Sequence, residues 1–241
     1  MGAGENRVLV VVPAWNEQES VAGVVRDVAS AMPEAVCVVV DDGSSDRTSE
    51  TARRAGAIVL TLPFNLGVGG AMRTGFRYAR DNGFGVVVQV DADGQHDPTA
   101  IPALIDGLRD ADLVIGARFA GVGDYRVMGP RRWAMRLLAV VLSRVSHTRL
   151  TDVTSGFKAS GPRAVALFAD NFPAEYLGDT IEALVIAARA GLRIRQLPVD
   201  MRVRQGGEPS HHPLKAGVYL VRACAAFLLA MMRPRTVLEE R

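Results

Sequence analysis

Residues 86–96 read VVVQVDADGQH, an apolar run that ends abruptly in carboxylates. Near-continuous valine is typical of a strand that is buried on both faces, as in a parallel sheet covered by helices. Asp91 and Asp93 are two residues apart, so their side chains point to the same face if the extended backbone continues. The segment therefore predicts a buried strand with a pair of carboxylates at its end.

Similar strand-like and helix-like segments alternate along the first half of the chain. Apolar, β-branched runs are separated by segments of helix length, which predicts an open α/β sheet whose ligands bind at the carboxyl ends of the strands. The predicted strands cover Val8–Val12, Val36–Val40, Ala57–Leu60, Val86–Val90 and Leu113–Ile115. The predicted helices cover Glu19–Ala31, Asp46–Arg54, Gly70–Asp81 and Thr99–Leu108, with Asp46 as an N-cap.

Polar residues follow three of the predicted strands, in the segments 13–17, 41–46 and 91–98. Each segment alone is compatible with ordinary turn and helix-cap chemistry. Three acidic clusters at one edge of one sheet repel each other unless a cation lies among them. The three segments together therefore favour a binding site for a cation or a cationic ligand.

The carboxylate pair suits a hard divalent cation. Mg²⁺ and Mn²⁺ are typically held by one or two carboxylates, while phosphate oxygens and waters fill the other positions. Asp91 and Asp93 are the predicted metal ligands, and Gln95 adds a third ligand more readily than His96. A zinc site is not indicated, because the four histidines and two cysteines do not have the spacing of a zinc site.

Two common nucleotide-binding loops can be tested directly. The first predicted strand is followed by residues 13–17, which contain no glycine, so the dinucleotide fingerprint is absent there, and so is the Walker sequence. Residues 65–70, NLGVGG, do open a predicted helix after a strand, but they lack the third glycine at the required offset. This loop indicates either close backbone packing or a helix N-terminus that faces an anion.

Composition and charge narrow the class of protein further. A chain of 241 residues with 49% hydrophobic and 22% charged residues is an ordinary globular protein, which excludes disordered and collagen-like classes. The chain has only two cysteines, Cys37 and Cys224, so we do not expect a disulfide framework. This low number fits a reducing, cytoplasmic setting. We also expect no secretory signal. Residues 1–120 carry a net charge of −6 and residues 121–241 one of +8. The acidic half suits a metal ion, and the basic half suits phosphate, nucleic acid or an anionic membrane.

Seven segments in a fixed order resemble the inverting glycosyltransferases of family 2, most closely the polyprenyl-phosphate branch that includes dolichyl-phosphate mannose and glucose synthases. The resemblance covers most of the chain and implies a GT-A fold, a Rossmann-like, mostly parallel sheet flanked by helices, over residues 1–213. Amphipathic helices near the C-terminus, with a helix and tail over residues 214–241, complete the expected organisation. The seven segments are 13–17, 40–46, 65–71, 91–96, 116–118, 152–158 and 204–207.

The resemblance implies a nucleotide-sugar donor whose diphosphate binds with Mg²⁺ or Mn²⁺. Trp15 occupies a position from which its ring can either stack on the base or pack in the core. Arg118, together with Arg202 or Arg204, is expected to bind phosphate. The metal ligands implied are Asp91, Asp93 and Gln95. The donor and its metal are expected to contact Pro13, Ala14, Trp15, Glu17, Asp42, Gly69, Asp91, Ala92, Asp93, Gln95, Arg202 and Arg204.

The acceptor implied is a polyprenyl phosphate, and this choice decides the chemistry. The second pKa of a phosphate monoester is about 6, so its oxygen is already an anionic nucleophile near neutrality and needs positioning more than deprotonation. A hydroxyl acceptor needs a carboxylate base instead, for which Asp152 and Asp179 are the candidates. The expected catalytic residues are Asp93, Arg118, Asp152 and Asp179, and the expected acceptor-phosphate contacts are Arg131, Arg132 and Ser155.

The basic half also predicts a peripheral membrane contact. Residues 125–151 contain six arginines and no acid, and as a helix they form a basic stripe opposite a broad apolar face. A core helix with solvated arginines is an equal alternative. The segment 214–234 repeats this pattern and is too interrupted to span a bilayer, so we expect surface association on the cytoplasmic face of the membrane or a homo-oligomer contact.

Three rival functions remain open at this level. The first is a soluble family member that glycosylates a small-molecule or polysaccharide hydroxyl, and the second is a nucleotide-binding module without activity. The third is nucleic-acid binding, which we do not expect because the arginines lie among long apolar faces rather than among exposed aromatic residues.

Overall fold

A computed structural model describes residues 7–117, 139–140, 142–144, 146, 148–173 and 179–202, apart from the side chain of Asp179. The strands are β1 (Val8–Ala14), β2 (Val36–Asp41), β3 (Ile58–Thr61), β4 (Val86–Gln89), β5 (Leu113–Ala117), β6 (Lys158–Ser160) and β7 (Ile194–Pro198). The α-helices are α1 (Val21–Ala31), α2 (Thr48–Arg54), α3 (Gly67–Asp81), α4 (Ile101–Asp106), α6 (Pro162–Asn171) and α7 (Asp179–Arg189). Two 3₁₀ turns, η1 (Pro98–Ala100) and η2 (Gly107–Arg109), flank α4.

The strands form one mixed sheet in the order β3-β2-β1-β4-β6-β5-β7. All neighbouring strands pair in parallel except β6, which is antiparallel to both β4 and β5. The expected α/β class with a mostly parallel sheet is confirmed, and each of the five predicted strands is present. The sequence pattern did not predict β6, β7, α6 or α7.

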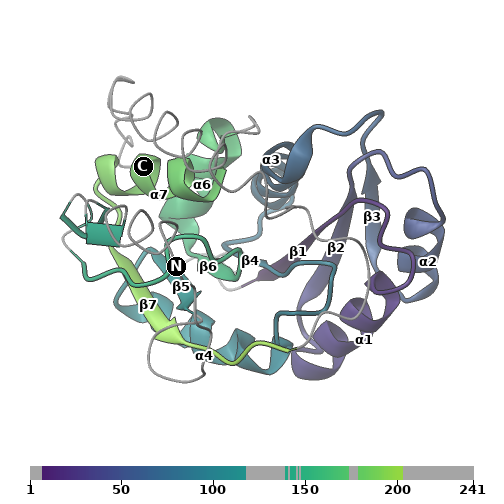
Figure 1. Ribbon diagram of the computed structural model, residues 1–241, viewed down its shortest axis with the longest axis horizontal. Helices are drawn as coiled ribbons and strands as arrows, with labels where there is room; N and C mark the ends of the chain where they lie inside the picture. Colours follow the sequence, from purple (N-terminus) through teal and green to yellow (C-terminus); the bar gives the residue numbers. More distant parts are fainter. Residues whose placement is uncertain are drawn as a thin grey trace, which may run out of the picture.

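Both faces of the sheet are covered, as the valine runs predicted. Leu9 and Val11 of β1 lie in a core formed with α3, α6 and α7, while Val10 and Val12 lie in a second core formed with α1 and α4. All four of these side chains are fully buried. Figure 1 shows the two helical layers on opposite sides of the sheet, with α2 beside β3.

The antiparallel strand β6 has a consequence for the site edge of the sheet. Its first residue, Lys158, is paired with Gln89 at the end of β4 and with Ile115 in β5. Because β6 runs against its neighbours, its beginning lies where theirs end. The segment before β6, residues 152–157, therefore reaches the edge at which β4 presents its carboxylates.

The predicted helix boundaries need correction. The second helix begins at Thr48, and its N-cap is Arg47 rather than the predicted Asp46; the Asp46 carboxylate lies before the helix and accepts hydrogen bonds from the Thr48 amide at 2.9 Å and from the Gln18 amide at 3.2 Å. The segment 99–108 is α4 flanked by two 3₁₀ turns instead of one helix. The predicted boundary between residues 1–213 and 214–241 lies outside the described residues.

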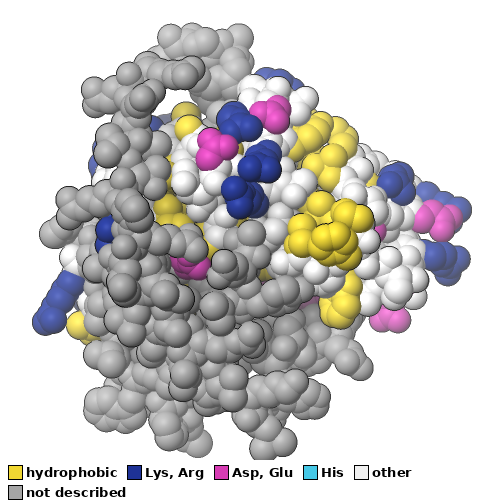
Figure 2. Space-filling view, turned by 90° about the horizontal axis from the view of Figure 1, so that it is seen from above, with side chains coloured by type: hydrophobic (Ala, Val, Ile, Leu, Met, Phe, Trp, Pro, Cys, Tyr) yellow, Lys and Arg dark blue, Asp and Glu magenta, His cyan; other side chains and the backbone are white. Residues whose placement is uncertain are grey.

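Arginines of α3 join this helix to α6. Arg73 Nη2 donates to the carbonyl oxygen of Asp170 at 2.8 Å, and Arg77 Nε donates to that of Ala169 at 3.1 Å. These carbonyls belong to the last turn of α6, where no intrahelical donor remains and positive charge is favourable. Figure 2 shows basic and acidic side chains together over this helix pair, with hydrophobic side chains beside them. In the described part of the chain, none of the helices has the length and apolar character needed to cross a membrane.

Candidate active site

The segments that follow β1 and β2 form one rigid unit. The Asn16 amide donates to Ser44 Oγ at 2.9 Å, and Asn16 Oδ1 accepts from the Ser45 amide at 2.9 Å. The Glu17 amide donates to Thr48 Oγ1 at 2.8 Å. Asn16 has a φ of +55°, a left-handed conformation that asparagine tolerates better than most residues. Two of the three predicted polar segments are thus brought together and preorganised.

Trp15 is the exposed member of the first segment. Its side chain is 55% exposed, whereas Pro13 and Ala14 are buried as the last residues of β1. The carbonyl oxygen of Ala14 accepts a hydrogen bond from the Asp42 amide at 2.9 Å. The exposure of Trp15 contradicts core packing and leaves its ring accessible to a planar ligand, which agrees with a base-stacking role.

The Asp42 carboxylate fixes the loop that precedes α3. Its two oxygens accept hydrogen bonds from the amides of Leu66 at 2.7 Å and Gly67 at 2.8 Å. Burial raises the pKa of Asp42, and the neighbouring charge of Asp41 acts in the same direction, while the two amide hydrogen bonds oppose them. Asp42 therefore holds the N-terminus of α3, in which Gly69 is buried, at the edge of the sheet.

Gly43 permits this arrangement. It has a φ of +72°, and a Cβ atom there would lie 2.8 Å from backbone atoms of Phe64. A side chain at this position would be strained and would displace the loop that Asp42 holds. The close approach of the β2–α2 segment to the β3–α3 loop thus depends on glycine.

The Asp91–Asp93 segment departs from the expected extended geometry. Strand β4 ends at Gln89, and residues 92–94 turn. Asp93 Oδ1 accepts a hydrogen bond from the Gln95 amide at 3.0 Å, and Gly94 has a φ of +76°. Because the backbone turns, the period of two no longer applies, and the argument that both carboxylates share a face of the strand was wrong. Asp91 and Asp93 instead lie in a tight loop, with Ala92 buried between them.

The donor set fits a divalent cation that also binds the ligand. Within the described ranges, no three His, Cys, Asp or Glu side chains are grouped as a ready-made metal site. Asp91 and Asp93 provide hard oxygen ligands, and the Asp91 side chain is 37% exposed. Two carboxylates completed by diphosphate oxygens and waters are a usual environment for Mg²⁺. These two carboxylates would hold the cation, and the position of Gln95 as a third ligand stays a prediction.

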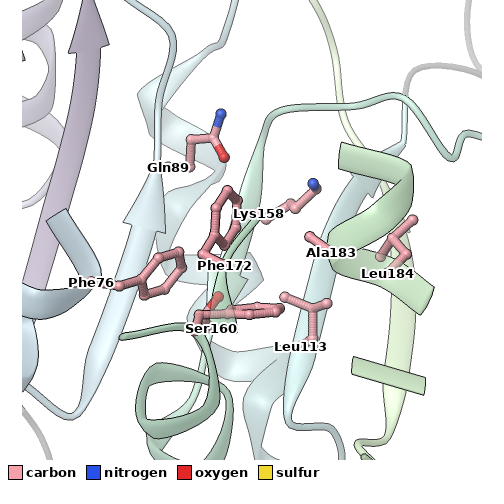
Figure 3. Close-up of a pocket in the computed structure, with 9 residues that line it drawn as sticks. Phe76, Gln89, Leu113, Lys158, Ser160, Phe172, Ala183 and Leu184 are labelled. Atoms are coloured by element: carbon pink, nitrogen blue, oxygen red, sulfur yellow. The ribbon is translucent and has the colours of Figure 1, made fainter. Parts of the chain in front are cut away.

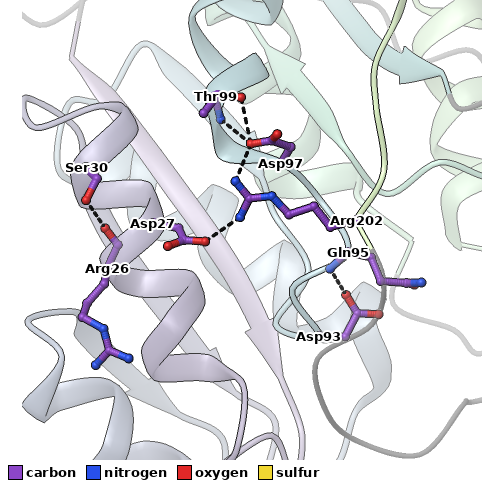
Figure 4. Close-up of polar contacts among 8 residues, drawn as sticks. All are labelled: Arg26, Asp27, Ser30, Asp93, Gln95, Asp97, Thr99 and Arg202. Atoms are coloured by element: carbon purple, nitrogen blue, oxygen red, sulfur yellow. Dashed lines mark hydrogen bonds and ion pairs between the residues drawn. The ribbon is translucent and has the colours of Figure 1, made fainter. Parts of the chain in front are cut away.

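Arg202 lies in a different environment from the one predicted. Its Nη1 pairs with Asp27 at 2.6 Å and its Nη2 with Asp97 at 2.8 Å, as Figure 4 shows. Burial acts to raise the pKa of Asp97, but hydrogen bonds from Thr99 and the charge of Arg202 outweigh it and hold the pKa below its usual range. The Arg202 guanidinium therefore neutralises two carboxylates in this structure, and its predicted role on the donor phosphate is not tested.

The backbone around Arg202 runs beside the carboxylate loop. The Arg202 amide donates to the carbonyl oxygen of Gln95 at 2.8 Å, and Met201 forms a β-bridge with His96. The chain that leads to residues 204–207 thus begins next to the Asp91–Gln95 loop. Arg204 itself lies outside the described residues.

Two predicted residues of the second half are buried next to this edge. Asp152 is 1% exposed, and its Oδ1 accepts from the amide and the hydroxyl of Thr154, each at 3.1 Å. Ser155 is 2% exposed, and its Oγ accepts from the Phe157 amide at 3.3 Å. Both side chains shape the segment that leads into β6. The remaining predicted residues Arg118, Arg131 and Arg132, and the side chain of Asp179, lie outside the described residues.

A small pocket lies beside β4 and β6, and two of the residues that line it, Gln89 and Lys158, were not predicted as site residues. Gln89, Lys158 and Ser160 are its polar members, and all three are buried. Figure 3 shows Gln89 and Lys158 at one end of the pocket, next to apolar side chains from α3, β5 and α7. Gln89 could have been recognised from the sequence, because it is the single polar residue within a run of valines. Lys158 is the last residue of the predicted segment 152–158 but was given no role, because its pairing with β4 is a long-range feature. The pocket is lined by Phe76, Gln89, Leu113, Lys158, Ser160, Phe168, Phe172, Ala183 and Leu184.

Comparison with known proteins agrees with this geometry. The family model described as Glycosyl transferase family 2 matches residues 9–165. An undecaprenyl-phosphate mannosyltransferase of Micrococcus luteus is 34% identical over 212 residues, which cover 84% of this chain and 86% of that protein. A polyprenol monophosphomannose synthase of Mycolicibacterium smegmatis is 33% identical over 174 residues, 66% of each protein.

The solved structures support the fold. A glucosyl-3-phosphoglycerate synthase of Mycobacterium tuberculosis, in complex with Mn²⁺, UDP and phosphoglyceric acid, matches with a TM-score of 0.71 and 23% identity. The match covers 95% of this chain and 79% of that one. The expected GT-A fold is thereby confirmed.

Proposed function

Because the chain belongs to glycosyl transferase family 2, we propose that it transfers a hexose, mannose or glucose, from a GDP- or UDP-linked sugar to a polyprenyl phosphate with inversion. The observation that carries this proposal is the carboxylate loop at the site edge in a chain whose relatives, at 33% and 34% identity, are named as mannose transferases of polyprenyl phosphates. Mannose is accordingly the first sugar to test.

On the donor side, the proposal assigns the base to Trp15 and the diphosphate to the carboxylate loop. Stacking on an exposed indole ring suits a planar base, and the segment around Trp15 is already ordered by its bonds to residues 44–48. This order reduces the entropy that the protein loses when the nucleotide binds. Arg118 and Arg204 remain the proposed phosphate ligands.

The proposed site uses Mg²⁺ or Mn²⁺, held by Asp91 and Asp93. When bound, the cation supplies positive charge that stabilises the departing nucleoside diphosphate. Asp91 and Asp93 contribute the negative charge that attracts the cation, and Asp93 is assigned to the side of the reacting sugar.

On the acceptor side, the phosphate oxygen of the lipid attacks the anomeric carbon directly. Since this oxygen is already anionic near neutral pH, the protein has to orient it in line with the leaving group rather than remove a proton. The hydrogen bonds that Asp152 Oδ1 accepts from the amide and the hydroxyl of Thr154 support this choice, because they engage that oxygen within its own turn and make it a poorer base. We assign the acceptor phosphate to Arg131, Arg132 and Ser155.

A lipid acceptor also requires contact with a membrane. We propose peripheral association on the cytoplasmic face, through the basic and apolar segments at 125–151 and 214–234. The same apolar faces serve equally well as contacts between copies of the chain.

The test is a transfer assay with purified protein in detergent. Radiolabelled GDP-mannose, GDP-glucose, UDP-mannose and UDP-glucose are each offered with polyprenyl phosphate, with Mn²⁺ and then with EDTA. We expect label to enter the organic phase with one donor, to require the metal and to be lost in Asp93→Ala.

Two matched acceptors separate the proposal from its rival. Free polyprenol has the same chain with a hydroxyl in place of the phosphate, and phosphoglyceric acid is a soluble acid with hydroxyl acceptors. Transfer to either of these but not to polyprenyl phosphate would replace the proposal with a family 2 enzyme that glycosylates hydroxyl groups. Binding of a sugar nucleotide without any transfer would favour a catalytically silent module.

A further inference from the structure

The Asp91 carboxylate is held by groups that are not themselves assigned to the metal or to the donor. Gln89 Nε2 donates a hydrogen bond to Asp91 Oδ1 at 3.2 Å. His96 Nε2 lies 3.5 Å from Asp91 Oδ2. One nitrogen thus faces each carboxylate oxygen, and the rotation of the side chain is restricted on both sides.

The hydrogen bonds of His96 assign its protonation state. The Asp91 amide donates to His96 Nδ1 at 3.0 Å, so Nδ1 carries no proton and the neutral ring has its proton on Nε2. That proton faces the Asp91 carboxylate. His96 therefore contacts Asp91 twice: Nδ1 accepts a hydrogen bond from the Asp91 amide, and Nε2 makes a longer polar contact with its carboxylate.

The imidazole ring is itself immobilised. His96 is 4% exposed and stacks on Phe157, with ring centroids 4.8 Å apart and an interplanar angle of 13°. The β-bridge to Met201 fixes its backbone from the other side. Because the ring has little freedom of its own, the position of its Nε2–H is set by packing.

Gly156 confines the carboxylate further. A Cβ atom at Gly156 would lie 3.0 Å from both Asp91 oxygens and 3.1 Å from Gln89 Nε2. A side chain at this position would force the Asp91 carboxylate and the Gln89 amide to give way by a few tenths of an ångström. The segment 152–157 thus closes one side of the Asp91 site.

We propose that His96 and Gln89 are positioning residues that hold the Asp91 carboxylate in its metal-binding orientation before the cation and the nucleotide arrive. The proposal rests on the proposed function, because it takes Asp91 as a ligand of the cation that accompanies the donor diphosphate. The hydrogen bond from Gln89 and the longer contact from His96 restrain the two oxygens on the protein side and leave lone pairs for a cation on the open side. Such supporting hydrogen bonds typically change metal affinity by about 10- to 100-fold.

Two histidine variants separate the roles of the ring nitrogens. In His96→Asn, the amide oxygen can replace Nδ1 as the acceptor for the Asp91 amide, but no group replaces Nε2–H. In His96→Gln, the amide nitrogen reaches the position of Nε2 and can still donate to the carboxylate. Gln89→Leu removes the donor to the other oxygen at a similar volume.

The experiment measures Mn²⁺ binding through the electron paramagnetic resonance signal of the free ion. One series of titrations contains GDP and a separate series contains UDP. We expect His96→Asn and Gln89→Leu to weaken Mn²⁺ binding by about 10-fold or more. His96→Gln should stay within about threefold of the parent. Calorimetric binding of the same nucleotide in EDTA, and the thermal unfolding midpoint, should change little in all three variants.

Each other outcome counts against the proposal. Equal Mn²⁺ affinity in the parent, His96→Asn and Gln89→Leu would overturn it, as would equal weakening in His96→Gln and His96→Asn, which would indicate a packing role alone. If a variant unfolds, Gly156→Ala provides a second test, since its methyl group displaces Asp91 without removing a donor and should also weaken Mn²⁺ binding.

Failure of the positioning role and failure of the proposed function can be distinguished by experiment. A parent protein that binds Mn²⁺ with a nucleotide, shows the expected variant order and transfers no sugar would refute the proposed reaction and leave the positioning role intact. A parent protein that binds no Mn²⁺ with either nucleotide would refute the positioning role, whatever the reaction.

Discussion

The packing of α3 on β1 makes Gly75 a sensitive position. A Cβ atom there would lie 2.5 Å from Val11 Cγ1 and 2.9 Å from Val11 Cγ2. Val11 is fully buried in β1, a strand held on both sides by β2 and β4. Gly75→Ala therefore forces α3 away from the sheet, because the strand cannot move without breaking its own pairing.

Two opposing effects set the size of this change. Alanine in a helix interior is favoured over glycine by about 1 kcal/mol. Carbon atoms prefer about 3.5 to 4 Å, so relief of the contact requires a shift of about 1 Å, and overpacking of this kind costs about 1–3 kcal/mol. Because the alanine methyl group would clash with a strand in the middle of the sheet, we expect an overpacking cost of about 2–3 kcal/mol, the upper part of this range. The expected net loss is about 1–2 kcal/mol, which lowers the unfolding midpoint by roughly 2–8 °C in a chain of this size.

The assay is equilibrium unfolding in urea for Gly75→Ala, Val11→Ala and the double variant. Val11→Ala removes the two methyl groups that clash, so the double variant avoids the whole overpacking cost and should lose about 2–3 kcal/mol less stability than the two single losses together. Simple additivity, or a Gly75→Ala protein more stable than the parent, would show that α3 does not press on β1 as described.

Three further predictions follow from single side chains. Asp42→Asn keeps one acceptor for the two amides at the start of α3 and should lower the free energy of unfolding by about 2–4 kcal/mol, measured in urea; an unchanged midpoint would contradict the capping role. Burial is outweighed by hydrogen bonds from Thr99 and the charge of Arg202, which lower the pKa of Asp97 in the fold, so these contacts stabilise the protein above the unfolded pKa of about 4 and less as pH falls through the folded pKa. The stability advantage of the parent over Asp97→Asn should therefore shrink from pH 7 to pH 3, and a constant advantage would exclude the electrostatic cause. Cys37 is half-buried, and burial raises the pKa of its thiol to about 12, so in a Cys224→Ser background it should react with a disulfide reagent at pH 8 much more slowly in the folded than in the unfolded protein; equal rates would contradict the raised pKa.

Much of the sheet was predictable because its strands are made of local, repetitive sequence. The valine runs of β1, β2 and β4 are buried on both faces, as the pattern requires. Strand β6 was not predictable in the same way, because its three residues, Lys158–Ser160, include no β-branched side chain and no alternation that a strand would need. Its pairing with β4 and β5 is set by tertiary contacts that no local window contains.

The candidate site was predictable in location and less so in detail. The ends of parallel strands meet at one edge, which is why the segments after β1, β2 and β4 could be grouped in advance. The orientation of Asp91 depends on His96 and on Gly156, and so could not be inferred from a period of two. Arg202 has partners 175 and 105 residues away along the chain, Asp27 and Asp97, and sequence spacing carries no information on pairs that distant.

The antiparallel insertion of β6 has a consequence for the order in which the protein matures during synthesis. Strands β1 to β4 can pair with one another as soon as residue 89 has emerged, while the other partner of β4, strand β6, is still to come. The carboxylate loop after β4 must wait for Gly156 and Lys158 from the segment that enters the middle of the sheet, and then for Met201 and Arg202. A nascent chain can therefore complete the β1–β4 pairings before the segment that confines the carboxylate loop has been synthesised.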